Sequence, residues 1–358
     1  MRGSPMSIYG LGMVSSLASG AAFNASAMRC AYDGFTRTAF VHPGCLEPLI
    51  GAPVGEEILG GRLNGTSKLE KMASLAIEEA IQPLSSSQYE GLTAIFCLPD
   101  RIPASYFNNE TAFQEIVDAV LQRLELFNLN PASCALWRHR CGFTSALSMA
   151  QRFLYRENHE FVLIVTLDSY LNQSALGYYS GTLYGENDRL LCKDNPNGFI
   201  PGEAATAVLL RTPGRDFSGV NIIGVGEAEE VATIGDEEAV MKGTGLSQAI
   251  NQAAVNADIG VHETDFRVAS MSGETYFFSE AAYAQSRTLK TKIDAHPVWH
   301  PAAYIGEVGA SIGGAIVIMA YYAFLEGYAP GPTVLCHISN DDKRRGAFIM
   351  QHRKGVDQ

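Results

Sequence analysis

Two stretches of the sequence decide the fold: CGFTSALSMAQRFLYRENHEFVLIVTL at 141–167 and GASIGGAIVIMAYYAFLEGYAPGPTVLCHI at 309–338. Each begins with small residues at helical spacing and continues, after a turn, into an apolar strand. Small side chains allow a helix to lie deep between two sheets. We therefore expect a duplicated α/β unit whose halves pack face to face; the alternative is one doubly wound domain with an extension.

The rest of the chain continues the alternation of strands and helices. Apolar runs predict strands at 8–14 and 92–97, and the helical repeat predicts helices at 68–81 and 110–124. The Pro-Gly pair at 213–214 is the expected joint, which gives a first half at 6–212, a second half at 213–352 and a tail at 353–358. Residues 1–5 have no signal-peptide core, and we interpret them as an added leader.

Composition limits the possible partners. The chain has 358 residues, 47% of them hydrophobic, and a net charge of −12. An acidic chain has no general attraction to nucleic acid or to anionic membranes. The most apolar run, at 312–325, is shorter than the roughly 20 residues that span a bilayer. We expect neither nucleic-acid binding nor membrane insertion.

The cysteine pattern favours a reducing compartment. Seven cysteines are scattered along the chain and form no C-x-x-C pair, so neither a zinc knuckle nor a disulfide framework is indicated. Reduced thiols are typical of cytoplasmic proteins. There is no P-loop, no dinucleotide-binding G-x-G-x-x-G and no H-E-x-x-H. We therefore expect a cytoplasmic protein with no cofactor and no metal.

Several motifs resemble those of β-ketoacyl synthases. The stretch GFIPGEAA at 198–205 resembles the signature G-F-x-x-G-E-G-A, and IYGLGMVSS at 8–16 resembles the first strand and turn. The region from Cys141 resembles the nucleophile segment, and GEVGASIG at 306–313 resembles G-H-x-x-G-A-x-G. The matches follow the family order and cover almost the whole chain from Met6. The resemblance implies a thiolase-like αβαβα layered fold with two pseudo-repeated halves, and a homodimer.

The departures from this pattern concern the catalytic residues. Under the resemblance, Cys141 has the nucleophile position, while Ser272 and Glu307 stand where the family has its two histidines. Ala302 replaces the expected lysine, and the late glycine-rich turn reads HISNDD at 337–342. A serine hydroxyl has no useful basicity near pH 7, and a carboxylate raises the energy of a nascent thiolate or enolate. We interpret Cys141 as vestigial or structural.

Three questions about these residues stay open at the level of sequence. A thiol at a helix N-terminus has a lowered pKa, so Cys141 could react without turnover. A buried Glu307 could serve as a base for other chemistry. His139 would share a side with Cys141 if the segment were extended, and His337 lies near the late loop, so either could replace a lost histidine.

A narrower resemblance suggests the function. Phrases such as LDSYL at 167–171, DRLL at 188–191, WHPA at 299–302, IGEVGA at 305–310, GYAPGP at 327–332 and NDD at 340–342 look like a bacterial group often labelled 3-oxoacyl-ACP synthase. The group is found beside type VI secretion components and toxic effectors, which implies a non-catalytic chaperone or adaptor for a secreted effector. Two alternatives are an acyltransferase or thioester hydrolase that uses Cys141, with an acyl carrier protein as partner, and a subunit resembling a chain-length factor.

Overall fold

The computed structural model describes residues 3–99, 110–126, 129–181, 188–215, 217–236 and 238–355, and it contains two copies of one α/β unit. The first copy contains β1 (Met6–Ser15), α1 (Ala21–Arg29), β2 (Thr36–Val41), β3 (Pro48–Gly51), α2 (Glu56–Leu59), α3 (Gly65–Ile81), α4 (Ser86–Tyr89), β4 (Thr93–Leu98), α5 (Glu110–Arg123), β5 (Cys134–Trp137), the 3₁₀ helix η1 (His139–Cys141), α6 (Gly142–Arg156), β6 (Phe161–Ser169), α7 (Gln173–Tyr179) and β7 (Glu203–Arg211).

The second copy is more compact. It contains β8 (Gly219–Glu229), α8 (Thr244–Ala257), η2 (Val261–Glu263), β9 (Phe266–Ala269), α9 (Thr275–Thr288), β10 (Val298–Trp299), α10 (Ala302–Ile305), η3 (Gly309–Ser311), α11 (Ile312–Leu325), β11 (Thr333–Ser339) and β12 (Arg344–Arg353).

The strand order demonstrates the duplication. The sheet runs β10-β9-β11-β12-β8-β1-β7-β6-β4-β5, and each half contributes five strands to it. When those five strands are numbered in chain order and read from the outer edge of the sheet to its centre, both halves have the order third, second, fourth, fifth, first. In both halves the pairs among the second, third and fourth strands are parallel and those that involve the fifth strand are antiparallel. Only two residue pairs, Met6–Ile222 and Ser7–Asn221, join the half-sheets. This topology confirms the duplicated unit and excludes the single doubly wound domain.

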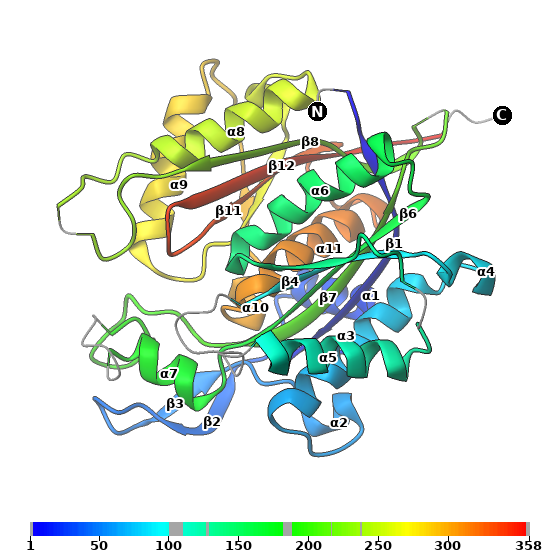
Figure 1. Ribbon diagram of the computed structural model, residues 1–358. Helices are drawn as coiled ribbons and strands as arrows, with labels where there is room; N and C mark the ends of the chain where they lie inside the picture. The colour runs from blue at the N-terminus through cyan, green and yellow to red at the C-terminus, as the bar shows by residue number, and fades with distance from the viewer. Residues whose placement is uncertain are drawn as a thin grey trace.

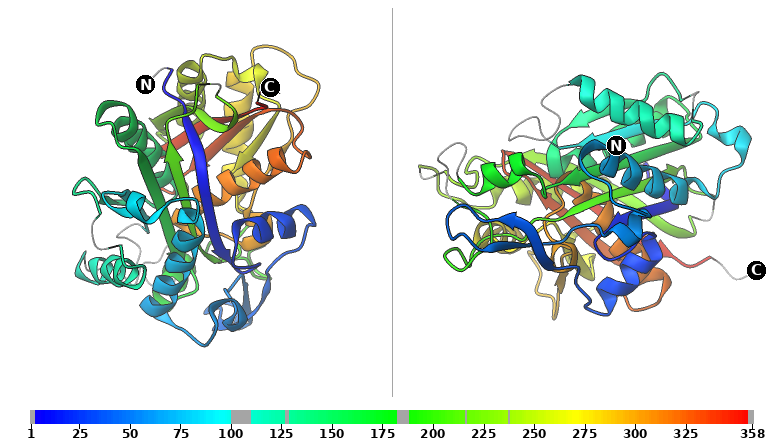
Figure 2. Two further views of the ribbon diagram at one scale, coloured as in Figure 1. Left: turned by 90° about the vertical axis from the view of Figure 1, so that its right-hand side faces the viewer. Right: turned by 90° about the horizontal axis from the view of Figure 1, so that it is seen from below.

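The layers alternate as expected for a thiolase-like fold. Helices α8 and α9 cover the outer face of the second half-sheet, and α3 and α5 cover that of the first. Helices α6 and α11 lie between the two half-sheets, and each contacts strands of both halves (Figures 1 and 2). The predicted αβαβα arrangement is confirmed, and so are the helices and strands predicted from periodicity, with bounds that differ by at most three residues.

The small residues of the two central helices have the packing role that the sequence indicates. A Cβ added at Gly313 of α11 would lie 2.3 Å from the Cβ of Phe143 in α6. One added at Gly314 would lie 1.8 Å from the Oγ1 of Thr206 in β7. Glycine is therefore required where α11 touches both α6 and the first half-sheet, and a larger residue would push these layers apart.

A separate two-stranded arm extends from the first half. Strands β2 and β3 pair only with each other, and the turn between them spans residues 42–47 (Figure 1). An isolated bridge between Ala52 and Gly202 fixes the base of this arm to the segment that precedes β7. None of the helices in the described parts of the chain is both long and apolar enough to cross a membrane.

Candidate functional site

The candidate site lies where the two central helices begin. Each helix is preceded by a 3₁₀ turn whose first residue has a positive φ: 49° at His139 before α6 and 52° at Gly309 before α11. A Cβ at Gly309 would lie 1.9 Å from Asp168 Oδ2, so that half requires glycine. In the other half a histidine adopts the left-handed conformation, which is strained for a residue with a side chain. Such strain is typical of functional or formerly functional positions.

Cys141 is the last residue of the first turn, and its thiol is turned inward. Its residue surface is only 2% exposed, and Sγ donates to the backbone carbonyls of Ile338 at 3.6 Å and Arg344 at 3.4 Å. Burial raises the pKa of the Cys141 thiol to about 12. At neutral pH the group is a neutral thiol engaged with backbone oxygen atoms, which is the environment of a structural cysteine.

His139 and Cys141 point to different neighbours. The sequence left open an extended segment that would place them on one side, but the segment is a 3₁₀ turn, so that arrangement is not found. The Nε2 atom of His139 contacts the Tyr170 hydroxyl in a very short hydrogen bond, and Nδ1 lies 3.2 Å from Asn340 Oδ1. The imidazole therefore contacts side chains, those of Tyr170 and Asn340, whereas the thiol contacts backbone carbonyls.

Glu307 is fully buried; one of its oxygens accepts a hydrogen bond, and the other forms an ion pair that is not aligned as a hydrogen bond. Oε1 accepts the Gly309 amide at 2.9 Å, and Oε2 lies 3.0 Å from Nη2 of Arg140, whose side chain is 1% exposed. Arg140 also reaches Asp341, with Nη1 2.7 Å from Oδ1. Burial opposes the charge of Arg140, yet Asp341 and Glu307 hold the pKa of its guanidinium well above its usual value. Glu307 is thus one end of a buried ion network.

The network continues through Arg189. Its guanidinium makes two hydrogen bonds to Glu274, of 2.7 and 2.8 Å, and two to Asp341, of 2.9 and 3.1 Å. Burial favours the neutral acid at Asp341, but Arg140 and Arg189 together hold the pKa of this carboxyl well below its usual range. Paired, bidentate contacts of this kind are the strong form of ionic hydrogen bond. The late loop, which the sequence marks as altered, supplies the central carboxylate.

Aromatic side chains complete the cluster. The Tyr179 hydroxyl donates to Asp341 Oδ2 at 3.2 Å and lies 3.4 Å from the Tyr170 hydroxyl, and the two rings stack with centroids 5.1 Å apart. Burial raises the pKa of both tyrosines well above the usual value. The region around His139 is therefore filled by hydrogen-bonded rings.

Asp168, near the end of β6, is a buried carboxyl that contacts the 3₁₀ turn before α11. Its Oδ2 accepts the Ala310 amide at 2.8 Å and its Oδ1 accepts the Ser169 amide at 2.8 Å. Burial raises the pKa of this carboxyl to about 7, although the two amides act in the opposite direction.

A second buried pair anchors the late loop. Arg345 Nε lies 2.6 Å from Glu280 Oε1, with both side chains fully buried. Nη1 of the same arginine donates to the carbonyls of Asn340 at 3.0 Å and Asp342 at 2.6 Å. These bonds fix the backbone on either side of Asp341, so the carboxylate at the centre of the network has a rigid support.

Ser272 and His337 lie apart from the ion network. Ser272 is half-buried, and its Oγ has no hydrogen-bond partner among the described residues. His337 is buried in β11, where burial, with a further contribution from Arg267, lowers its pKa to about 3. Neither Ser272 nor His337 makes a bond to Cys141 among the interactions found in the described chain.

The cations of the network were not among the residues singled out from the sequence. Arg140 stands directly before Cys141, and Arg189 follows Asp188 in a phrase noted only for its resemblance to a bacterial group. One signal was available: a glutamate such as Glu307, if buried, requires a cation nearby, because buried charges are paired.

The architecture is that of a thiolase-like ketosynthase fold, and a buried ion network lies where its two central helices begin. No family model matches the chain, and no curated protein matches it.

Solved structures do match. One is a chain of the AntDE:AntF complex, a type II PKS acyl-carrier protein with its ketosynthase bound to the hexaketide: TM-score 0.78, 12% identity, covering 98% of this chain and 100% of that chain. Another is the ishigamide ketosynthase/chain length factor: TM-score 0.77, 13% identity, 99% and 100% covered. A β-ketoacyl synthase from Burkholderia phymatum STM815 has a TM-score of 0.72 at 13% identity, with 98% and 100% covered. At such identities the likeness establishes the fold.

Proposed function

We propose that this protein is a non-catalytic, thiolase-fold chaperone or adaptor, which binds a secreted effector of a type VI secretion system in the cytoplasm as a homodimer. One observation carries the non-catalytic part: Arg140 is buried between Glu307 and Asp341 at the start of the central helices. Side chains of the protein itself fill the place where, under the family resemblance, an acyl thioester would react.

The electrostatics of the site argue against the acyltransferase or thioester hydrolase alternative. With a pKa of about 12, roughly one Cys141 thiol in 10⁵ is ionised at pH 7. A nucleophilic cysteine needs a base within hydrogen-bond reach, but this thiol contacts two backbone carbonyls. Ser272 and Glu307, at the positions of the family histidines, supply neither a base nor an oxyanion donor.

The effector-binding part rests on the narrower resemblance, and the network supports it. The phrases shared with the secretion-associated group include Asp168, Tyr170, Arg189, Glu307 and Asp341. In this protein Arg189 bonds Asp341, and Glu307 and Asp168 accept backbone amides of the 3₁₀ turn before α11. The Tyr170 hydroxyl bonds His139 in the other turn. A group that keeps these residues keeps a rigid scaffold with no free nucleophile, which fits a protein that acts by binding.

Affinity capture from the native host tests the proposal. The tagged chain is expected to retain a secreted effector encoded near its own gene, identified by mass spectrometry, and an unrelated protein with the same tag serves as control. In parallel, the purified protein should not decarboxylate malonyl-ACP or elongate acyl-ACP. Ketosynthase complexes with an acyl-carrier protein or a chain length factor are known among the structural neighbours. Capture of either kind of partner, with measurable acyl transfer, would overturn the proposal.

A further inference from the structure

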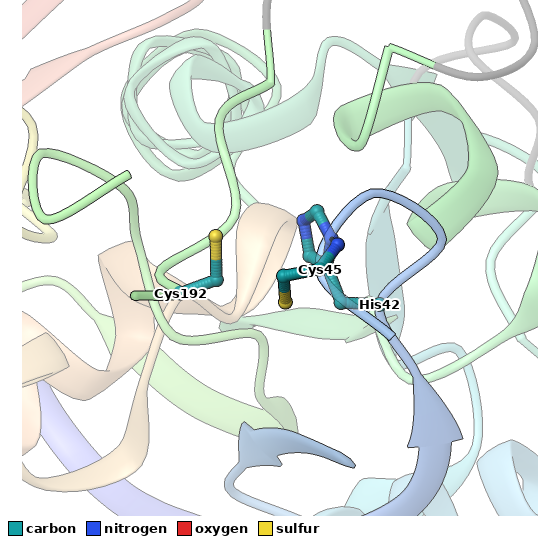
Figure 3. Close-up of side chains that lie close together, drawn as sticks. All are labelled: His42, Cys45 and Cys192. Atoms are coloured by element: carbon teal, nitrogen blue, oxygen red, sulfur yellow. Dashed lines mark hydrogen bonds between the residues drawn. The ribbon is translucent and has the colours of Figure 1, made fainter. Parts of the chain in front are cut away.

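A histidine and two cysteines meet at the edge of the two-stranded arm, outside the ion network. His42 and Cys45 belong to the turn between β2 and β3, and Cys192 belongs to the loop that follows α7. Their potential ligand atoms all lie within 4.8 Å of one another. Figure 3 shows the three side chains at the contact between these loops. His42, Cys45 and Cys192 all lie in turns or loops, where the backbone can move to adjust the positions of these side chains.

The imidazole of His42 is buried and lacks a good partner on one nitrogen. The residue is 2% exposed. Its Nδ1 accepts the amides of Gly44 at 3.1 Å and Cys45 at 3.3 Å. Its Nε2 lies 3.0 Å from Asp188 Oδ2, but the ring N–H is not aligned with that oxygen, so no hydrogen bond forms. A buried nitrogen that is close to a carboxylate but unbonded requires an explanation.

Asp188 lies beside two members of the cluster but not within 4.8 Å of all three ligand atoms. Its Oδ1 accepts the Leu190 amide at 3.0 Å, which leaves Oδ2 facing His42 and the Cys192 thiol, 3.9 Å away. This oxygen is therefore available as a fourth ligand after a small movement of the loop.

We propose that His42, Cys45, Asp188 and Cys192 bind one zinc-class divalent ion. The donors come as two pairs, H-x-x-C from one turn and D-x-x-x-C from the other, and paired ligands two to four residues apart are typical of structural zinc sites. One nitrogen, two sulfurs and one carboxylate oxygen make a borderline-soft set that zinc accepts. Binding through Nε2 releases the two thiol protons and moves the imidazole proton from Nε2 to Nδ1. Protonated Nδ1 can no longer accept the Gly44 and Cys45 amides, so the ring and the turn must adjust when the ion binds.

The ion would fasten the arm to the loop that holds the ion network. Asp188 directly precedes Arg189, whose guanidinium bonds Glu274 and Asp341. Without the ion, the contacts described between the turn and this loop are the His42–Asp188 pair and the exposed Lys193–Glu47 pair. The ion is thus structural, with four protein ligands, and this inference does not depend on the proposed effector binding.

Metal content of the full-length chain tests the site. After purification under reducing conditions, incubation with Zn²⁺ and desalting, we expect one zinc per chain by elemental mass spectrometry. Replacement by Co²⁺ should give thiolate-to-cobalt charge-transfer absorption. Cys45→Ser, Cys192→Ser and His42→Ala should each weaken Zn²⁺ binding by about tenfold or more. Cys30→Ser is the matched control, because Cys30 is an exposed cysteine outside the cluster.

A second readout needs no variant and remains valid if a substitution prevents folding. Zn²⁺ should protect two thiols of the wild-type chain from a thiol-specific reagent, and peptide mapping should identify them as Cys45 and Cys192. Three results would overturn the proposal: no retained zinc, equal loss of zinc in Cys30→Ser, or a Cys45–Cys192 disulfide in protein purified with its cellular redox state preserved.

Discussion

Removal of the Arg140 guanidinium should destabilise the protein far more than removal of an exposed arginine. In Arg140→Met, Glu307 would remain fully buried without its cation, and Asp341 would keep only Arg189. Two unit charges 3.0 Å apart attract by about 5 to 6 kcal/mol at an effective dielectric constant of about 20. Desolvation offsets part of this, and breaking a buried pair from one side typically costs about 3–5 kcal/mol.

The double variant separates the ion pair from the loss of packing. Arg140→Met with Glu307→Gln removes both charges, while the glutamine oxygen can still accept the Gly309 amide. We expect it to be more stable than the sum of the two single losses implies, with a coupling energy of about 1–3 kcal/mol. The control is Arg152→Met, because Arg152 and Glu157 form a half-exposed pair, and such pairs are worth about 1 kcal/mol or less.

Urea denaturation at one fixed protein concentration measures these differences, since the stability of an oligomer depends on concentration. Equal slopes for all variants would show that the compared states are the same. The reasoning about the network is refuted if Arg140→Met is no less stable than Arg152→Met, or if the losses in the double variant simply add.

Three further predictions concern titration, the thiol and assembly. The folded pKa of Asp168, about 7, lies above its ordinary value of 3.8, so the folded state binds the extra proton. The stability of wild type relative to Asp168→Asn should therefore fall as pH rises from about 4 to 7. Between pH 5 and pH 8 the loss should be on the order of 3 kcal/mol. A difference in urea midpoints that stays constant with pH would contradict this. Iodoacetamide should label exposed Cys30 much faster than Cys141 in folded protein, and equal labelling rates by peptide mapping would contradict the structural role of Cys141. Cys141→Ala should lower the free energy of unfolding only through lost packing, by about 1 kcal/mol. Sedimentation should show a homodimer, and monomer alone at micromolar concentration would exclude it.

The fold could be predicted because its signals are local. Small residues at helical spacing before an apolar strand occur twice, at 141–167 and 309–338, and each signal is contained within about 30 residues. Both stretches form a central helix followed by a strand of a half-sheet. The buried character of these helices also follows from composition, because Ile312 to Ala320 contain no charged or strongly polar residue.

The sequence indicates which positions belong to the site, but it does not indicate which side chains bond to one another there. The sequence indicates that Glu307 and the late loop depart from a catalytic pattern, but the partner of each carboxylate depends on how the two halves pack. Arg140 and Asp341 are 201 residues apart, and Arg189 and Asp341 are 152 apart. The His42–Cys45 spacing was visible in the sequence, but a search for C-x-x-C pairs overlooks it, and Cys192 joins it only through the tertiary fold.

The span of the ion network has a consequence for synthesis of the chain. Arg140, in the first half, has its carboxylate partners at 307 and 341, near the end of the second half. At about 5–20 residues per second, a ribosome needs roughly 10 to 40 s to extend the chain from Arg140 to Asp341. During that interval the first half emerges with Arg140 but without Glu307 and Asp341, the two carboxylates that pair with it in the folded chain. The complete ion network can therefore form only after residue 341 has been synthesised.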